Sequence, residues 1–233
     1  MAELLYEGKA KQVYKTEKED EYLIHYKDDA TAGNGVKHDK FEGKGVLNNT
    51  ISCIIFDMLE EAGIKTHMIK KLNERDILVK KVDIFPLEVI IRNITTGSFC
   101  KRLGAPEGVV LDEPIFEMSY KNDEYGDPLI NDDHAVALKL ATREELAYIR
   151  ETTLKINELL KEFFLSMNLK LVDFKIEFGK TADGTILLAD EISPDSCRLW
   201  DVETNQKYDK DVFRQDIGDL IETYKAVLAR MQS

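Results

Sequence analysis

The sequence has few of the features that mark exported, membrane-bound or zinc-binding proteins. Its three cysteines are scattered and form no C-x-x-C pair, so neither a disulfide framework nor a zinc site is predicted. No apolar run approaches the ~18 residues of a membrane-spanning helix. The first residues also lack the basic and apolar segments of a signal peptide. We therefore expect a cytoplasmic protein with reduced thiols and no membrane association.

Positive charge is also scarce. Lys and Arg number 32 against 44 Asp and Glu, which gives a net charge of −12. Because nucleic-acid binding depends on neutralising phosphates with Lys and Arg, no nucleic-acid partner is expected. An anionic ligand would need a local cluster of basic side chains. The hydrophobic content of 43% and the charged content of 33% are those of an ordinary globular enzyme.

Several common active-site motifs are absent from the chain. It contains neither the P-loop pattern G-x-x-x-x-G-K-[S/T] nor the dinucleotide pattern G-x-G-x-x-G. No Ser-His-Asp or Cys-His arrangement is visible. The histidines have no metal-ligand spacing, and we interpret all of them as structural or surface residues: His25, His38, His67 and His134.

The segment from Leu171 to Gly179 carries the strongest signal in the chain. Its side chains alternate between apolar and charged with a period of two, which predicts a half-buried β-strand. The apolar face consists of Val172, Phe174, Ile176 and Phe178, and the charged face consists of Asp173, Lys175 and Glu177.

A tight-turn dipeptide, Asp183-Gly184, predicts that this strand pairs with a second one over residues 185–192. A two-residue turn places Glu177 opposite Asp190, and a four-residue loop shifts the register by two but keeps Asp190 on the same face. Like charges that face each other destabilise a strand pair, so a cation is expected between them. Mg²⁺ is the preferred candidate because hard divalent ions bind carboxylate oxygens. The alternative is an exposed hairpin whose acids face water.

Basic residues near this carboxylate pair indicate phosphate binding. Lys175 shares the acidic face, and Arg198 follows shortly after the second strand. Near the start of the chain, Gly8-Lys9-Ala10-Lys11, with Val13 just beyond, places two lysines beside a glycine that lets a ligand approach the backbone. A simple surface turn is the alternative for this segment.

Two further expected strands carry basic residues. In the strand over 76–83, Lys80 and Lys81 lie on opposite faces, so one points inward or sits at the strand end; an exposed edge lysine is the alternative. Arg92 lies at the end of the strand over 87–94, and Ser98 opens the next helix. A guanidinium fork and helix N-terminal N–H groups both suit phosphate or carboxylate. N-capping by Ser98 is compatible with that role.

The element pattern predicts an α+β fold with mostly antiparallel sheets and flanking helices. Helices are expected over 46–61, from the capping box that begins at Thr142, and from about residue 210. A boundary before Phe85-Pro86 would divide a β-rich N-terminal lobe, 1–84, from a C-terminal lobe, 85–233, that carries the metal and substrate sites. The remaining strands are expected at 4–7, 11–16, 21–27 and 65–71.

Two segments, Pro86–Ser98 and Leu171–Gly179, closely resemble the signatures of the SAICAR synthetases of purine biosynthesis, in their short monofunctional bacterial form. The resemblance runs through the chain, from Gly8–Lys11 to Asp190–Asp201 and Phe213–Gln215. It implies a two-lobed fold related to ATP-grasp and kinase-like proteins, with ATP between the lobes. The implied reaction joins 5-amino-1-(5-phosphoribosyl)imidazole-4-carboxylate to L-aspartate through an acyl phosphate, with release of ADP and phosphate.

The resemblance also implies roles for individual residues. Mg²⁺ would bind to Glu177 and Asp190, and Asp173 is the candidate base for the aspartate amine. Lys175, Asp173 and Lys11 are the implied catalytic residues. The ATP site would comprise Gly8, Lys9, Ala10, Lys11, Val13, Lys80, Lys81, Val82, Glu177 and Asp190, and the imidazole nucleotide would bind Arg92, Ser98, Lys175 and Arg198.

Two other function classes share part of this pattern. A small-molecule kinase would use the same metal pair and phosphate loop, and a non-catalytic module would bind the nucleotide alone. The sequence leaves open the oligomeric state, for which a homodimer is one candidate, and the residues that bind aspartate. It also leaves open whether the loop from Gly33 to Gly45 closes as a lid.

Overall fold

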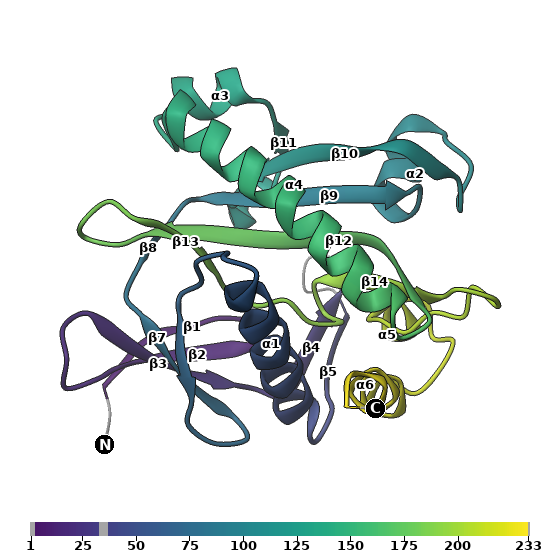
Figure 1. Ribbon diagram of the computed structural model, residues 1–233, viewed down its shortest axis with the longest axis horizontal. Coiled ribbons are helices and arrows are strands. Elements are labelled where there is room, and N and C mark those ends of the chain that lie inside the picture. Colours follow the sequence, from purple (N-terminus) through teal and green to yellow (C-terminus); the bar gives the residue numbers. More distant parts are fainter. Residues whose placement is uncertain (1–2, 33–36, 233) are drawn as a thin grey trace.

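The computed structural model describes residues 3–32 and 37–232, and these form two antiparallel sheets with helices against them (Figure 1). The five-stranded sheet has the order β1-β2-β3-β7-β6, and the larger one has the order β11-β10-β9-β12-β13. Strands β8 and β14 pair with β12 outside that order, and β4 pairs with β5. The α+β class with antiparallel sheets is therefore confirmed.

The elements have the following bounds. The smaller sheet contains β1 (Leu4–Glu7), β2 (Lys11–Lys15), β3 (Glu21–Tyr26), β6 (Met68–Lys71) and β7 (Asp76–Lys80). The larger sheet contains β8 (Asp83–Ile84), β9 (Leu87–Ile94), β10 (Val110–Tyr120), β11 (Leu129–Ile130), β12 (Leu169–Lys180), β13 (Ile186–Ala189) and β14 (Cys197–Asp201). The separate pair is β4 (Asp29–Ala32) and β5 (Lys37–Lys40). The helices are α1 (Lys44–Glu61), α2 (Gly97–Leu103), α3 (Asp132–Ala137), α4 (Arg143–Leu165), α5 (Asp211–Arg214), α6 (Leu220–Met231) and the 3-10 turn η1 (Asp123–Tyr125).

Strand β12 is the centre of the larger sheet, because β8, β9, β13 and β14 all pair with it. Its apolar face is buried as the alternation predicts, with Phe174 and Phe178 each 1% exposed. Burial of one such side chain contributes about 1.5–3 kcal/mol. The charged face is not solvated either: Asp173 and Glu177 are buried. The charged residues therefore point into the molecule, and the exposed-hairpin alternative is wrong.

Helix α4 covers one face of this sheet and packs against β9 and β12 (Figure 1). It begins at the predicted capping box, in which Thr142 accepts from the Glu145 N–H and Glu145 accepts from the Thr142 N–H. Leu146, Ile149 and Ile156 recur on one side of the helix and are buried. No helix among residues 3–32 and 37–232 combines the length and the apolar character needed to cross a bilayer.

The C-terminal helix α6 lies beside α1, so the end of the chain packs against its N-terminal part (Figure 1). One continuous apolar core joins α1, the smaller sheet, the larger sheet and α4. The boundary expected before Phe85 stays a prediction. Gly33 and Gly35 of the expected lid lie outside the described residues, and β5 and the start of α1 occupy much of the rest of that segment.

Two details of the sequence interpretation are wrong. The hairpin loop spans Thr181 to Thr185, so Glu177 pairs with Ala189 and not with Asp190. The expected closing helix is divided into α5 and α6, because Asp216 has a left-handed φ of 55° and Gly218 follows. Helical periodicity continues across such a break, so the pattern alone did not reveal it.

Gly45, near the start of α1, shows how closely that helix approaches the smaller sheet. Its N–H donates to Asp28 at 3.0 Å, and Arg75 binds both Asp28 and the Tyr26 carbonyl. A Cβ at position 45 would overlap the Tyr26 carbonyl oxygen and lie 2.8 Å from Arg75 Nη1. Only glycine fits this contact without moving backbone.

We predict that Gly45→Ala lowers the free energy of unfolding by about 1–3 kcal/mol through overpacking. Alanine's better helix propensity, worth about 1 kcal/mol, does not offset the clash. Urea unfolding of both proteins measures the difference. The control is Gly218→Ala, whose nearest neighbours would be 3.8 Å away on Val212 and which should change stability by less than about 0.5 kcal/mol. A Gly45→Ala protein as stable as the original would show that α1 has room to shift.

Candidate functional site

A cavity of about 750 Å³ lies between the two sheets. The smaller sheet supplies an apolar wall that includes Val13, Ile24 and Val79, continued by Val82 just after β7. The larger sheet supplies a charged wall that includes Glu88, Lys175, Glu177 and Asp190. An apolar slot next to a few convergent charges is the usual form of a small-molecule site.

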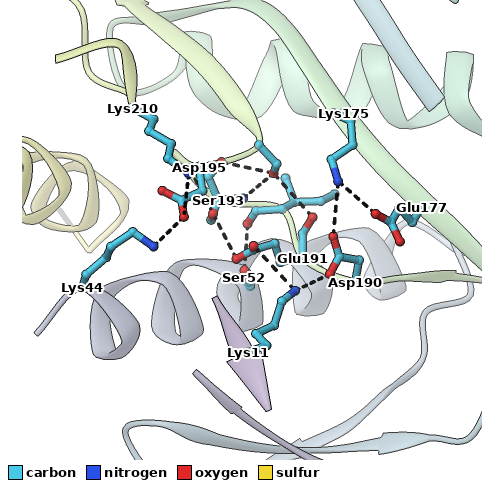
Figure 2. A network of polar contacts seen from close by, with 12 residues as sticks. Lys11, Lys44, Ser52, Lys175, Glu177, Asp190, Glu191, Ser193, Asp195 and Lys210 are labelled. Carbon is cyan, nitrogen blue, oxygen red and sulfur yellow. Dashed lines mark hydrogen bonds and ion pairs between the residues drawn. The ribbon is translucent and has the colours of Figure 1, made fainter. Parts of the chain in front are cut away.

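The charged wall is built around the two carboxylates that the sequence singled out. Lys175 Nζ lies 2.9 Å from Glu177 Oε1 and 3.7 Å from Asp190 Oδ2. Lys11, from β2, donates to Asp190 from the opposite side and lies 3.6 Å from Glu191. Figure 2 shows Lys175 and Lys11 converging on Asp190 from different elements. The carboxylate pair is thus held by lysines from both sheets.

Burial and charge together set the ionisation of this group. Burial alone would lower the pKa of Lys11, but the negative charges of Asp190 and Glu191 outweigh it and hold the pKa well above its usual value. The pKa of Lys175 is raised in the same way, against burial, by Glu177, Asp190 and Glu88. Burial would raise the pKa of Asp190, but Lys11 and Lys175 hold it well below its usual range. Both lysines and Asp190 are therefore charged at neutral pH.

Asp190 reaches Glu177 by a route that the sequence did not predict. The pairing with β13 ends at Ala189, and Asp190 takes a left-handed φ of 61°. A non-glycine residue in this region is uncommon and often belongs to a functional site. The turn redirects the Asp190 side chain toward Lys175. The one-residue error in register is thereby compensated, and Asp190 remains close to Glu177.

The predicted nucleotide residues fall mostly on this cavity. Gly8, Lys9, Ala10, Lys11, Val13, Lys80 and Val82 all line it. Lys80 sits at the end of β7, one of the two positions expected for it. Lys81 does not line the cavity: it is exposed, and its ammonium lies 5.7 Å from the centre of the Tyr22 ring.

The predicted imidazole-nucleotide residues form a second cluster farther along the charged face of β12. Asp173 Oδ2 accepts from Arg92 at 3.2 Å and from Arg198 at 2.8 Å. Arg92 also binds Glu117 at 2.7 Å and Ser98 at 3.1 Å, and it is only 3% exposed. Arg198 contacts Asp211 at 3.0 Å.

Thr96, not Ser98, is the N-cap residue of α2, so the capping role considered for Ser98 is wrong. The Ser98 hydroxyl instead accepts a hydrogen bond from Arg92. Gly97, between them, has a φ of 56°, and a Cβ there would lie 2.7 Å from Arg198 Nη2. Glycine at this position lets the Arg198 guanidinium lie against the backbone at the start of α2.

Several charged residues that sequence reasoning missed belong to the same region. Lys121, just after β10, binds Glu177 Oε2 at 2.5 Å, and Asp123 binds Lys9 at 2.7 Å. Behind Glu191, a buried Lys44 lies 2.5 Å from Asp195 (Figure 2). Lys44, Lys121 and Asp123 lie in no recognisable local motif, because each meets its partner through tertiary packing alone.

His67 is buried, 3% exposed, and it lines the cavity; its interpretation as a structural residue stays a prediction. Burial and the nearby Lys11 charge lower its pKa to about 3, so the ring is neutral at physiological pH.

The donor chemistry of this site fits Mg²⁺. Among the described residues, no group of three or more His, Cys, Asp and Glu side chains could hold a metal ion by itself. Mg²⁺ in phosphoryl-transfer sites uses one or two carboxylates and completes its shell with substrate phosphates and water. Glu177 and Asp190 supply two such carboxylates at the edge of a cavity large enough for a nucleotide. Mg²⁺ would therefore bind at these two carboxylates together with the nucleotide, whose phosphates would complete its ligand shell.

The chain is similar to known proteins over almost its whole length. Residues 4–231 match the SAICAR synthetase family. The phosphoribosylaminoimidazole-succinocarboxamide synthase of Finegoldia magna is 67% identical over 230 residues, which make up 99% of this chain and 99% of that protein.

Solved structures agree with the sequence match. The phosphoribosylaminoimidazole-succinocarboxamide synthase of Ehrlichia chaffeensis has a TM-score of 0.97 at 45% identity and covers 99% of this chain and 98% of its own. A SAICAR synthetase in complex with ADP has a TM-score of 0.94 at 51% identity, over 97% of this chain and 96% of its own. With sequence, fold and charged motifs in agreement from one end to the other, the chain belongs to the SAICAR synthetase family.

Proposed function

We propose that this protein joins 5-amino-1-(5-phosphoribosyl)imidazole-4-carboxylate to L-aspartate at the expense of ATP, as a cytoplasmic enzyme of purine biosynthesis. The observation that carries the proposal is the carboxylate pair of buried Glu177 and half-buried Asp190, held by Lys11 and Lys175 beside a nucleotide-sized cavity. Membership of the family supports it, as does the ADP complex of a relative with 51% identity.

The reaction needs activation because a carboxylate would have to expel oxide. One carboxylate oxygen attacks the γ-phosphorus of ATP, the bond to ADP breaks, and an acyl phosphate forms. The aspartate amine then attacks the acyl carbon, phosphate leaves, and the nitrogen loses a proton. Both steps bring anions together, so the site must supply positive charge at their meeting point.

The chain's own residues divide this work between the two clusters. The apolar wall and the strand end from Lys80 to Val82 would hold adenine, and Lys81 would contribute through its backbone. The Gly8–Lys11 segment would hold the phosphates. Lys175 lies between the cavity and the Asp173 cluster, where the carboxylate and the γ-phosphate meet. Bound Mg²⁺ would be held by Glu177 and Asp190 and would neutralise charge on the phosphates.

Arg92, Ser98 and Arg198 would bind the imidazole nucleotide through the second cluster. Asp173 was the candidate base for the amine, but its Oδ2 already accepts from two guanidinium groups. These contacts favour a positioning role, in which Asp173 orients Arg92 and Arg198. The homodimer stays a prediction.

A coupled ADP-release assay, with each of the three substrates omitted in turn, tests the proposed function. We expect ADP release at a steady rate only when the imidazole carboxylate, aspartate and ATP are all present. Steady ADP release without aspartate would indicate a kinase. ATP binding without turnover in the complete mixture would indicate a nucleotide-binding module.

We predict that Glu177→Gln and Asp190→Asn each lower kcat by at least about 100-fold, because each removes a charge from the metal pair. The amides keep the shape of the side chains, so circular dichroism should report the same fold. Steady-state turnover at saturating Mg²⁺ measures the effect. Near-normal kcat in either variant would remove that carboxylate from the metal site.

The two arginines generate a second prediction. Lysine cannot reproduce a guanidinium fork, so Arg198→Lys should raise KM for the imidazole nucleotide by roughly 10- to 150-fold, equivalent to about 1.5–3 kcal/mol, with little change for ATP. Arg92→Lys should raise the same KM and also lower the melting temperature, because Arg92 is buried and bonded to Glu117, Asp173 and Ser98. Equal KM changes for both substrates would indicate that the arginines only hold the fold.

A further inference from the structure

Each carboxylate oxygen of Glu177 is paired with a lysine ammonium group. Its Oε1 accepts from Lys175 at 2.9 Å, and its Oε2 accepts from Lys121 at 2.5 Å. The Glu177 side chain is 3% exposed while both lysines cover it. A divalent cation that binds Glu177 would lie close to two ammonium groups of the same charge sign, and this repulsion favours the departure of one lysine.

Lys175 is the less mobile of the two. It lies within β12, and its ammonium is shared among Glu177 at 2.9 Å, Glu88 at 3.2 Å and Asp190 at 3.7 Å. Its side chain is 30% exposed. Departure of Lys175 would leave three carboxylates without their common cation, which is unfavourable inside a protein.

Lys121 can leave at much lower cost. Among the described residues its ammonium makes one ion pair, with Glu177, and its side chain is 43% exposed. The residue follows the last residue of β10, where its backbone N–H donates to Pro86 at 3.0 Å and fixes the base of the side chain. A flexible four-carbon stem on a fixed base can swing its ammonium within the cavity that it lines.

We propose that Lys121 is the counter-ion of Glu177 in the nucleotide-free enzyme, that a divalent cation displaces it, and that it then binds the phosphate oxygens of ATP. The inference rests on the proposed metal and nucleotide site. Lys9, on the opposite side of the cavity, pairs with Asp123, two residues after Lys121. Lys9 and the released Lys121 would thus flank the phosphate chain from the two sheets.

This exchange predicts opposite effects of one substitution. Lys121→Met removes a cation that competes with the metal, so Mn²⁺, which takes the same oxygen ligands as Mg²⁺, should bind the nucleotide-free protein roughly fivefold more tightly, equivalent to about 1 kcal/mol. The same variant should bind ADP with Mn²⁺ roughly tenfold more weakly, because one charge-assisted phosphate contact is lost. A residue that only stabilises the fold would not tighten metal binding.

Free Mn²⁺ measured by electron paramagnetic resonance, and calorimetric titration with ADP, provide the two readouts. The matched control is Lys180→Met: Lys180 lies on the same strand as Glu177, is also 43% exposed, and pairs with Glu145 at 2.7 Å away from the main cavity. It should change neither affinity. Lys121→Arg keeps the charge and should not tighten Mn²⁺ binding. In a protein that already carries Glu177→Gln, adding Lys121→Met should not tighten Mn²⁺ binding, because the paired carboxylate is absent.

Unchanged, weaker or undetectable Mn²⁺ binding by nucleotide-free Lys121→Met at millimolar metal would overturn the displacement. Unchanged ADP affinity would overturn the phosphate contact. These measurements need neither the imidazole nucleotide nor aspartate, so they fail independently of the proposed reaction. If the original protein turns over all three substrates but Lys121→Met does not bind Mn²⁺ more tightly, the proposed function stands and the displacement of Lys121 is wrong.

Discussion

The interaction on which the site depends is the pairing of buried carboxylates with lysines from separate elements. Glu177 and Asp190 lie where burial penalises charge, and Lys11, Lys175 and Lys121 reach them from β2, β12 and the end of β10. The positive charge that phosphates need is therefore already part of the folded structure, although the chain as a whole carries −12.

The same pairing ties the two sheets together across the cavity. Lys11 belongs to the smaller sheet, and Asp190 follows β13 of the larger sheet. His67, just before β6, strengthens the connection because its backbone N–H donates to the Leu188 carbonyl of β13 at 2.8 Å. The side chain of Asp190 is thus held by Lys11 of the smaller sheet directly after the left-handed turn. A ligand between the sheets meets a wall whose charges are already oriented.

The sequence predicted the parts of this arrangement that depend on local pattern. The alternation in Leu171–Gly179 identified β12, and the strand over 87–94 coincides with β9. The carboxylate pair followed from the charged face, even though the register was wrong by one residue and Asp190 reached its place through a left-handed turn. A period-two pattern shows which side chains share a face, but it does not contain the length of the loop that joins two strands.

Partners that meet only through tertiary packing were not predictable in the same way. Lys121 lies 56 residues before Glu177, and Lys11 lies 179 residues before Asp190. Only the resemblance to a known family connected Lys11 with that site. Lys121 belongs to none of the signature segments, and nothing in its neighbourhood marks it as a ligand of a buried acid. The break between α5 and α6 was missed for a related reason, since apolar spacing does not register one left-handed residue at Asp216.

Three charged residues of β12 connect the cluster around Asp173 with the cluster around Glu177. Asp173, Lys175 and Glu177 follow one another on one face, and alternate residues of a strand are separated by about 6.6 Å. Asp173 organises the arginines proposed for the imidazole nucleotide, and Glu177 belongs to the proposed metal and ATP site. Lys175 lies between them on the same face of the strand. One strand can thus align both substrates and the charge between them, because its geometry fixes their spacing before either substrate binds.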